Sequence, residues 1–392
     1  MPAFAANNNP NGKSCLKAGQ TIKFDNFQYQ CKKSGNKFIW IKIGTKKKIP
    51  PTTSVPTKSP TYLSSKEAAK GAPCRIKGQE SFPMSGPLRC VEGKWSNVLK
   101  AEDSVATRAF RYVLEKYNSN PPAKLTFKFL ADPNFTGSLK ILEGSKEAAA
   151  RLWNKVDTPF QPYPIVIGNS LDWIKKTAKA NNLTTNTGDF KNIENQYAQW
   201  NGCSYAEFYS QNGQPWYLYC YSQPESEMRE SIGFLQVGAH EYTHLIQFYI
   251  ADSNLKRFGE ALPPWLQEGY AMFAGISLGA AAGAGNDIRA LQLEVLSIVK
   301  TPLSDYTQRF PANWSDVYVL GYLAVEALTA VKGIEIMEEI ILEQKNGSSK
   351  EEAIQKVTGK SLAFWTEIGQ SYADSVKAGK TWSLDELFRR AA

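Results

Sequence analysis

The sequence predicts an α+β protein in which residues 100–392 form one large domain, preceded by two small β modules. Three observations predict this class. Short β-prone stretches occur before residue 222, apolar residues recur at helical spacing from residue 287 onward, and one cysteine-containing pattern occurs twice before residue 100. The large domain is long enough to bury a substantial core.

The chain begins with a segment that has features of an export signal. Ala3-Phe4-Ala5 has the small-x-small form of a signal-peptidase site, but the charged and apolar regions that normally precede such a site are missing. We therefore expect residues 1–14 to be the remnant of an export signal, or alternatively a disordered start.

Residues 15–44 and 71–98 contain two copies of a cysteine and tryptophan pattern. In each copy a second cysteine follows the first by 16 positions and precedes a glycine- and lysine-containing turn and a tryptophan. We predict a strand with the first cysteine, a return strand with the second, and a third strand with the tryptophan. Units this small bury little apolar surface, so a disulfide would be the main contribution to their stability. They resemble the short modules appended to exported actinobacterial proteins.

The six cysteines form three local pairs in the sequence, separated by 16, 16 and 17 positions. An even count in small flanking modules favours disulfides and an oxidising compartment. Zinc binding is the alternative, but no Cys-x-x-Cys spacing occurs. The predicted disulfides are Cys15–Cys31, Cys74–Cys90 and Cys203–Cys220.

The excess of positive charge lies in the N-terminal part of the chain. Residues 1–100 hold 18 Lys+Arg against 4 Asp+Glu, whereas residues 101–392 hold 28 against 33. We expect residues 1–100 to bind an anionic cell-envelope polymer or lipid surface; the alternative is that the lysines only keep the modules soluble. No recognition motif suggests nucleic acid. Residues 45–70, rich in proline, threonine and lysine, have linker composition.

The elements of residues 100–392 follow from apolar spacing. No apolar run reaches the roughly 18 residues of a membrane span, so we expect no transmembrane segment. We expect a secreted or extracellular protein, either free or associated with the cell wall. The glycine- and alanine-rich stretch 275–285 predicts a lip of a cleft or a loose loop. Strands are predicted at 124–129, 163–167 and 216–221, and helices at 101–117, 138–156, from 170, 315–331, 333–345 and 362–377.

The chain has only two histidines, His240 and His244, and they flank Glu241 in a His-Glu-x-x-His motif. Residues four apart lie on one face of a helix, so both imidazoles can bind one Zn²⁺. Glu241 would act as general base on a water that the metal activates. The apolar residues on both sides of the motif, from Ile232 to Ile250, predict a buried helix. A buried helix is a rigid element that can hold metal ligands in place.

A third donor follows in residues 265–271, Trp-Leu-Gln-Glu-Gly-Tyr-Ala, where prolines at 263 and 264 predict the start of a helix. This segment after His-Glu-x-x-His resembles the gluzincin clan, which includes thermolysin and the aminopeptidase N-like enzymes. The resemblance implies that Glu268 is the third ligand. It also implies a zincin-like domain with a sheet-bearing upper lobe and a helical lower lobe.

A tyrosine downstream is a candidate for the oxyanion donor. Residues 318–321 resemble the Tyr-x-x-Gly segment of aminopeptidase N-like gluzincins, which implies that Tyr318 donates to the substrate oxyanion. The alternative is a half-buried tyrosine that packs on the next helical turn. Tyr322 is the second candidate for the same role.

The sequence departs from the gluzincin pattern in three places. His244 and Glu268 are 24 positions apart, which is more than in the familiar gluzincins. We therefore expect a loop at 251–262 between the two helices that carry the ligands. Met272 replaces the aspartate that orients a histidine in thermolysin-like enzymes, so the expected partner of the imidazoles is not identified. The Gly-x-Met-Glu-Asn segment, with which the aminopeptidases bind the free amine of a substrate, does not occur upstream of the motif. Residues 216–221 would take the place of its strand, either as an edge strand that pairs with an extended peptide or as an ordinary edge strand.

These observations predict a secreted zinc metallopeptidase, and an endopeptidase rather than an aminopeptidase, that hydrolyses peptides or proteins. One alternative is a catalytically silent zincin fold. The other is a cell-envelope-binding protein in which residues 1–100 carry the main role.

Overall fold

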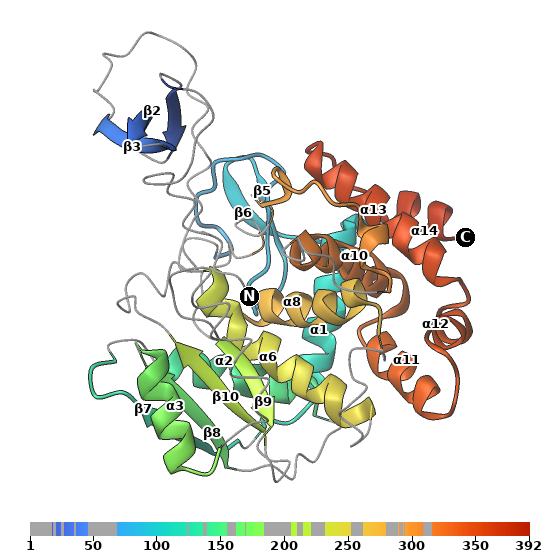
Figure 1. The fold of residues 1–392 in the computed structure, drawn as a ribbon. Coiled ribbons are helices and arrows are strands. Elements are labelled where there is room, and N and C mark those ends of the chain that lie inside the picture. The colour runs from blue at the N-terminus through green and yellow to red at the C-terminus, as the bar shows by residue number, and fades with distance from the viewer. Residues whose placement is uncertain are drawn as a thin grey trace. The chain divides into compact units, whose positions relative to one another are not determined.

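The structure is a computed structural model in which helices and sheets occur together, so the predicted α+β class is confirmed at this level (Figure 1). The chain divides into two compact units, residues 2–61 and 62–392. The described residues are 18, 21–24, 27–34, 37–45, 69–123, 125–135, 139–154, 162–168, 170–183, 205–209, 215–220, 232–251, 262–279, 289, 293, 295–308 and 316–392.

The first unit contains one antiparallel sheet in the order β1-β2-β3, formed by β1 (Thr21–Phe24), β2 (Phe27–Ser34) and β3 (Lys37–Thr45). Cys31 on β2 pairs in register with Trp40 on β3. Cys31 is disulfide-bonded. Its predicted partner, Cys15, lies outside the described residues.

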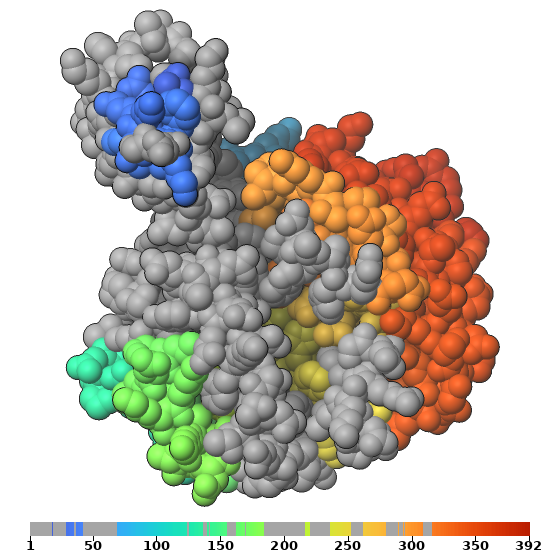
Figure 2. Space-filling view, viewed as in Figure 1, coloured from blue at the N-terminus to red at the C-terminus, as the bar shows by residue number. Residues whose placement is uncertain are grey.

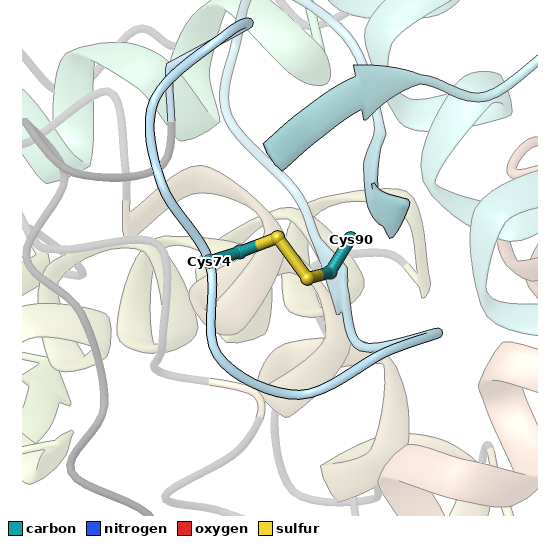
Figure 3. Close-up of a disulfide and its surroundings, with 2 residues drawn as sticks. All are labelled: Cys74 and Cys90. Atoms are coloured by element: carbon teal, nitrogen blue, oxygen red, sulfur yellow. A yellow bond between two sulfur atoms is a disulfide. The ribbon is translucent and has the colours of Figure 1, made fainter. Parts of the chain in front are cut away.

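The second copy of the pattern pairs its cysteine and tryptophan in the same way. Cys90 lies opposite Trp95, and the predicted Cys74–Cys90 disulfide is present (Figure 3). The strands of this copy are β4 (Glu80–Ser81), β5 (Leu88–Val91) and β6 (Lys94–Asn97). Glu92 and Gly93 join β5 to β6, and both have positive φ, as a type I′ hairpin turn requires.

The prediction of a strand at the first cysteine is wrong for this copy. Cys74 is in an irregular segment, which is joined to the hairpin of β5 and β6 by the isolated bridge between Pro73 and Lys94 and by backbone hydrogen bonds such as that from the Cys74 N–H to the Gly93 carbonyl. Gly71 and Gly78, both at positive φ, turn the chain on either side of Cys74, so the pairing does not extend into a strand.

Residues 71–98 belong to the same compact unit as residues 100–392. The Phe82 ring packs against Phe110 with centroids 5.2 Å apart. Ser104 Oγ donates a hydrogen bond of 2.7 Å to Glu80 Oε2. The second cysteine module is therefore packed onto the first helix of the large domain.

The large unit has a four-stranded sheet in the order β7-β8-β10-β9. β7, β8 and β10 are parallel, and β9 is antiparallel at the edge. Alternate residues of β10 pack on opposite faces, with Trp216 and Leu218 in one core and Tyr217 and Tyr219 in the other. The strands are β7 (Phe127–Ala131), β8 (Tyr163–Gly168), β9 (Tyr205–Tyr209) and β10 (Pro215–Cys220).

The expectation that residues 216–221 form an edge strand is wrong, both as a peptide-binding edge and as an ordinary one. β10 lies between β8 and β9. Its aromatic residues are buried on both faces, which is typical of an interior strand covered by helices on each side. The edge position belongs to β9, which was not predicted.

The helices agree in type with those predicted, with shifted ends. The first begins at Val105 rather than at 101, because Ser104 Oγ accepts from the Thr107 N–H and caps it. Gly275 is in a buried helix rather than in a loop. The helices are α1 (Val105–Ser119), α2 (Leu139–Leu152), α3 (Leu171–Ala180), α6 (Ile232–Ala251), α8 (Pro264–Leu278), α10 (Asp316–Lys332), α11 (Ile336–Lys345), α12 (Lys350–Thr358), α13 (Leu362–Lys377) and α14 (Leu384–Ala391), with 3-10 turns η1 (Lys100–Glu102) and η4 (Leu303–Tyr306).

Glycines allow the central helices to approach at backbone contact. A Cβ on Gly269 of α8 would lie 2.4 Å from the carbonyl oxygen of Gly321 on α10. A Cβ on Gly321 would lie 2.5 Å from the carbonyl oxygen of Trp265. The glycines of the two sequence motifs that contain Glu268 and Tyr318 therefore form one helix crossing.

No single helix in the described part of the chain is long and apolar enough to cross a membrane. α10 and α11 meet the length and composition criteria only as a pair, and a bend of 91° separates them.

Candidate metal centre

One contact with α2 and one with Trp153, just after α2, orient the helix that bears the histidines. Ser145 Oγ accepts a hydrogen bond of 2.8 Å from the Ala239 N–H, and Trp153 Nε1 donates at 3.0 Å to Thr243 Oγ1. A Cβ on Gly238 would lie 2.8 Å from Ser145, so glycine permits this close packing. Residues 239 and 243 lie one turn apart and anchor one side of α6.

His240 and His244 of α6 and Glu268 of α8 meet as the sequence predicts. The two Nε2 atoms are 3.0 Å apart. Glu268 Oε2 lies 3.4 Å from His240 Nε2 and 3.3 Å from His244 Nε2. All three residues are buried, and together they could hold a metal ion.

The donor atoms fit a tetrahedral metal ion. For metal–ligand bonds of about 2.0–2.1 Å, tetrahedral donors lie roughly 3.3 Å apart, close to the observed separations of 3.0–3.4 Å. Glu268 Oε2 and His240 Nδ1 have no hydrogen-bond partner among the described residues. Converging buried lone pairs repel one another unless a proton or a cation lies between them.

The charges of His240, His244 and Glu268 depend on one another. Burial lowers the pKa of His240. Burial also opposes charge on His244, but the Glu268 carboxylate outweighs it and raises the pKa of His244 to about 9. Burial alone would raise the pKa of Glu268, whereas the histidines hold it well below its usual range. A metal ion that binds these atoms therefore competes with protons for the same lone pairs.

Glu241 lies between the two ligands on α6 and is 7 % exposed. Its negative charge acts to raise the pKa of both imidazoles. His244 is 8 % exposed. Figure 2 shows atoms of α6, in yellow, set back in a hollow of the surface.

The structure separates the two candidate tyrosines of α10. The Tyr318 ring lies beside His240, with centroids 5.9 Å apart. Tyr322 donates at 2.7 Å to Glu326 Oε2 instead. Glu326 also accepts from Arg289 at 2.9 and 2.7 Å and from Tyr372 at 2.6 Å. Tyr322 thus belongs to a buried network away from the metal ligands.

One residue near the metal ligands was missed by the sequence analysis. Gln247 Oε1 lies 2.8 Å from His244 Nδ1. Its position three residues after His244, on the same helix face, is the signal that could have identified it. Most of the predicted loop 251–262, and Cys203 of the third predicted disulfide, lie outside the described residues.

Comparisons with protein families, with curated proteins and with solved structures find no match to this chain.

Proposed function

We propose that this chain is a zinc-dependent peptidase of the gluzincin type, with a zincin-like fold. The observation that carries the proposal is the convergence of His240 Nε2, His244 Nε2 and Glu268 Oε2 within 3.4 Å. Two imidazoles and one carboxylate, with a fourth position open, are a common ligand set of catalytic zinc. The β7–β10 sheet would be the upper lobe and the helices from α8 onward the lower lobe.

In the proposed mechanism, bound zinc supplies Lewis acidity, which polarises the substrate carbonyl and lowers the pKa of water. Glu241 takes a proton from the attacking water and passes it to the leaving amine. Tyr318 donates a hydrogen bond to the oxyanion that forms from the substrate carbonyl. We propose an endopeptidase, because the sequence has no Gly-x-Met-Glu-Asn anchor for a free amine.

Metal content tests the proposal directly. Purified protein should contain about one zinc per chain by mass spectrometry. Loss of a residue that only hydrogen-bonds to a metal ligand typically weakens metal affinity about 10–100-fold. Glu268→Ala should weaken zinc affinity by more than this, because it removes a direct ligand. Glu351→Ala, which changes an exposed glutamate of α12, is the control and should bind zinc normally. A parent protein that binds no zinc would refute the peptidase proposal.

Tyr318→Phe should lower kcat by about 100–1000-fold with little change in KM, since it removes a donor used in the transition state. Zinc content should not change. Tyr322→Phe is the matched control: it removes a hydroxyl that donates to Glu326, so it should reduce the free energy of unfolding by about 1–3 kcal/mol and leave kcat intact. Equal kcat values for Tyr318→Phe and wild type would rule out the donor role.

The predicted envelope partner is also a proposal. In the second cysteine module, Arg75, Lys77 and Lys94 are exposed. These cations support binding to an anionic polymer outside the cell, which would concentrate a secreted peptidase there.

A further inference from the structure

Gln247 is a buried amide that contacts both ligand-bearing helices. It lies one turn after His244 on α6 and has no exposed surface. Its Oε1 atom lies 2.8 Å from His244 Nδ1. Its Nε2 atom lies 3.0 Å from the carbonyl oxygen of Gln267, the residue before Glu268, and 3.3 Å from Met337 Sδ.

The partners of the amide determine its orientation and the tautomer of His244. A carbonyl oxygen and a thioether sulfur can only accept, so the NH₂ group of Gln247 faces them. The amide oxygen then faces His244 Nδ1, which must carry a hydrogen to donate to it. In the neutral imidazole, the form that binds a metal ion, the lone pair of His244 is therefore on Nε2, the atom that faces His240 and Glu268.

Only a side chain with both a donor and an acceptor satisfies these contacts. A glutamate at 247 would accept from His244 Nδ1, but its second oxygen would face the Gln267 carbonyl oxygen at about the present 3.0 Å. A methionine would fill a similar volume and make neither bond. By contrast, His240 Nδ1 has no hydrogen-bond partner in the described part of the chain.

We propose that Gln247 is a positioning residue of the metal centre. It holds His244 as the Nδ1–H tautomer and ties this imidazole to the backbone that precedes Glu268, so one side chain sets the spacing of ligands on two helices. This role rests on the proposed metal binding. It predicts an effect on metal affinity and ligand geometry beyond any effect on folding.

The test compares Gln247→Met with wild type by zinc competition against a chromophoric chelator and by the visible spectrum of the Co²⁺-substituted protein. Gln247→Met should weaken zinc affinity about 10–100-fold, as loss of an outer partner typically does, and should change the Co²⁺ bands. Gln236→Met is the matched control, since Gln236 is also fully buried in α6 but packs against Gly275. It should keep the affinity and spectrum of wild type.

Gln247→Glu keeps an acceptor beside His244 Nδ1 but loses the donor to the Gln267 carbonyl, so its zinc affinity should fall, by less than that of Gln247→Met, and its Co²⁺ bands should change. This variant carries the test if Gln247→Met does not fold, and an affinity and spectrum equal to wild type in it would overturn the proposal. Unchanged affinity and spectrum in Gln247→Met would overturn the positioning role alone. A wild-type protein that binds neither zinc nor Co²⁺ would overturn both this role and the proposed function.

Discussion

Glu241→Gln is expected to keep zinc and lose peptide hydrolysis. The amide has nearly the shape of the carboxylate, but it cannot take a proton from water, and general base catalysis contributes about 100–10,000-fold in rate. His240, His244 and Glu268 are unchanged in this variant, so the ligand set remains. Zinc content by mass spectrometry and cleavage of quenched fluorescent peptides, measured on one preparation, check both parts.

Glu351→Gln is the control for this experiment, because it makes the same chemical change on an exposed face of α12. Full hydrolysis by Glu241→Gln would exclude the general base. A wild-type protein that holds zinc but cleaves no peptide in a diverse library would instead favour the silent zincin fold.

Gly321→Ala is expected to lower the free energy of unfolding by about 1–3 kcal/mol, the usual cost of overpacking. The new Cβ would lie 2.5 Å from the Trp265 carbonyl oxygen and 3.2 Å from the backbone of Gly269. Backbone atoms cannot rotate aside as a flexible side chain can, so α8 must shift, and Glu268 with it. Zinc affinity should therefore fall together with stability in denaturant unfolding.

Gly379→Ala separates this effect from an ordinary glycine substitution. Gly379 has a φ of +72° and no heavy atom within 4 Å of a Cβ. Alanine there should cost stability through the backbone alone and leave zinc affinity unchanged. If Gly321→Ala matches Gly379→Ala in zinc affinity, the glycine crossing does not position the metal ligand.

Much of the secondary structure could be predicted from the sequence, because apolar periodicity is a local property of the chain. The strand at 163–167 and the helix that follows Ser170 are found where expected. The wrong predictions concern residues whose structure depends on neighbours that are distant in the sequence. The gluzincin resemblance favours an edge position for residues 216–221, but β9 covers β10, and the turns at Gly71 and Gly78 keep the segment with Cys74 from forming a strand.

The sequence by itself determined the histidine pair and the glutamate between them, because residues four apart on a helix share one face whatever surrounds it. Glu268 was implied only by resemblance, and Tyr318 and Tyr322 remained alternatives. Tertiary structure decided these points. Glu268 reaches the histidines because α8 packs on α6, where Gly275 lies against Gln236 and Gln247 bonds to the carbonyl of Gln267. Packing of α10 on α8 at Gly269 and Gly321 places Tyr318 beside His240. Such contacts join residues distant in the chain, so no local pattern encodes them.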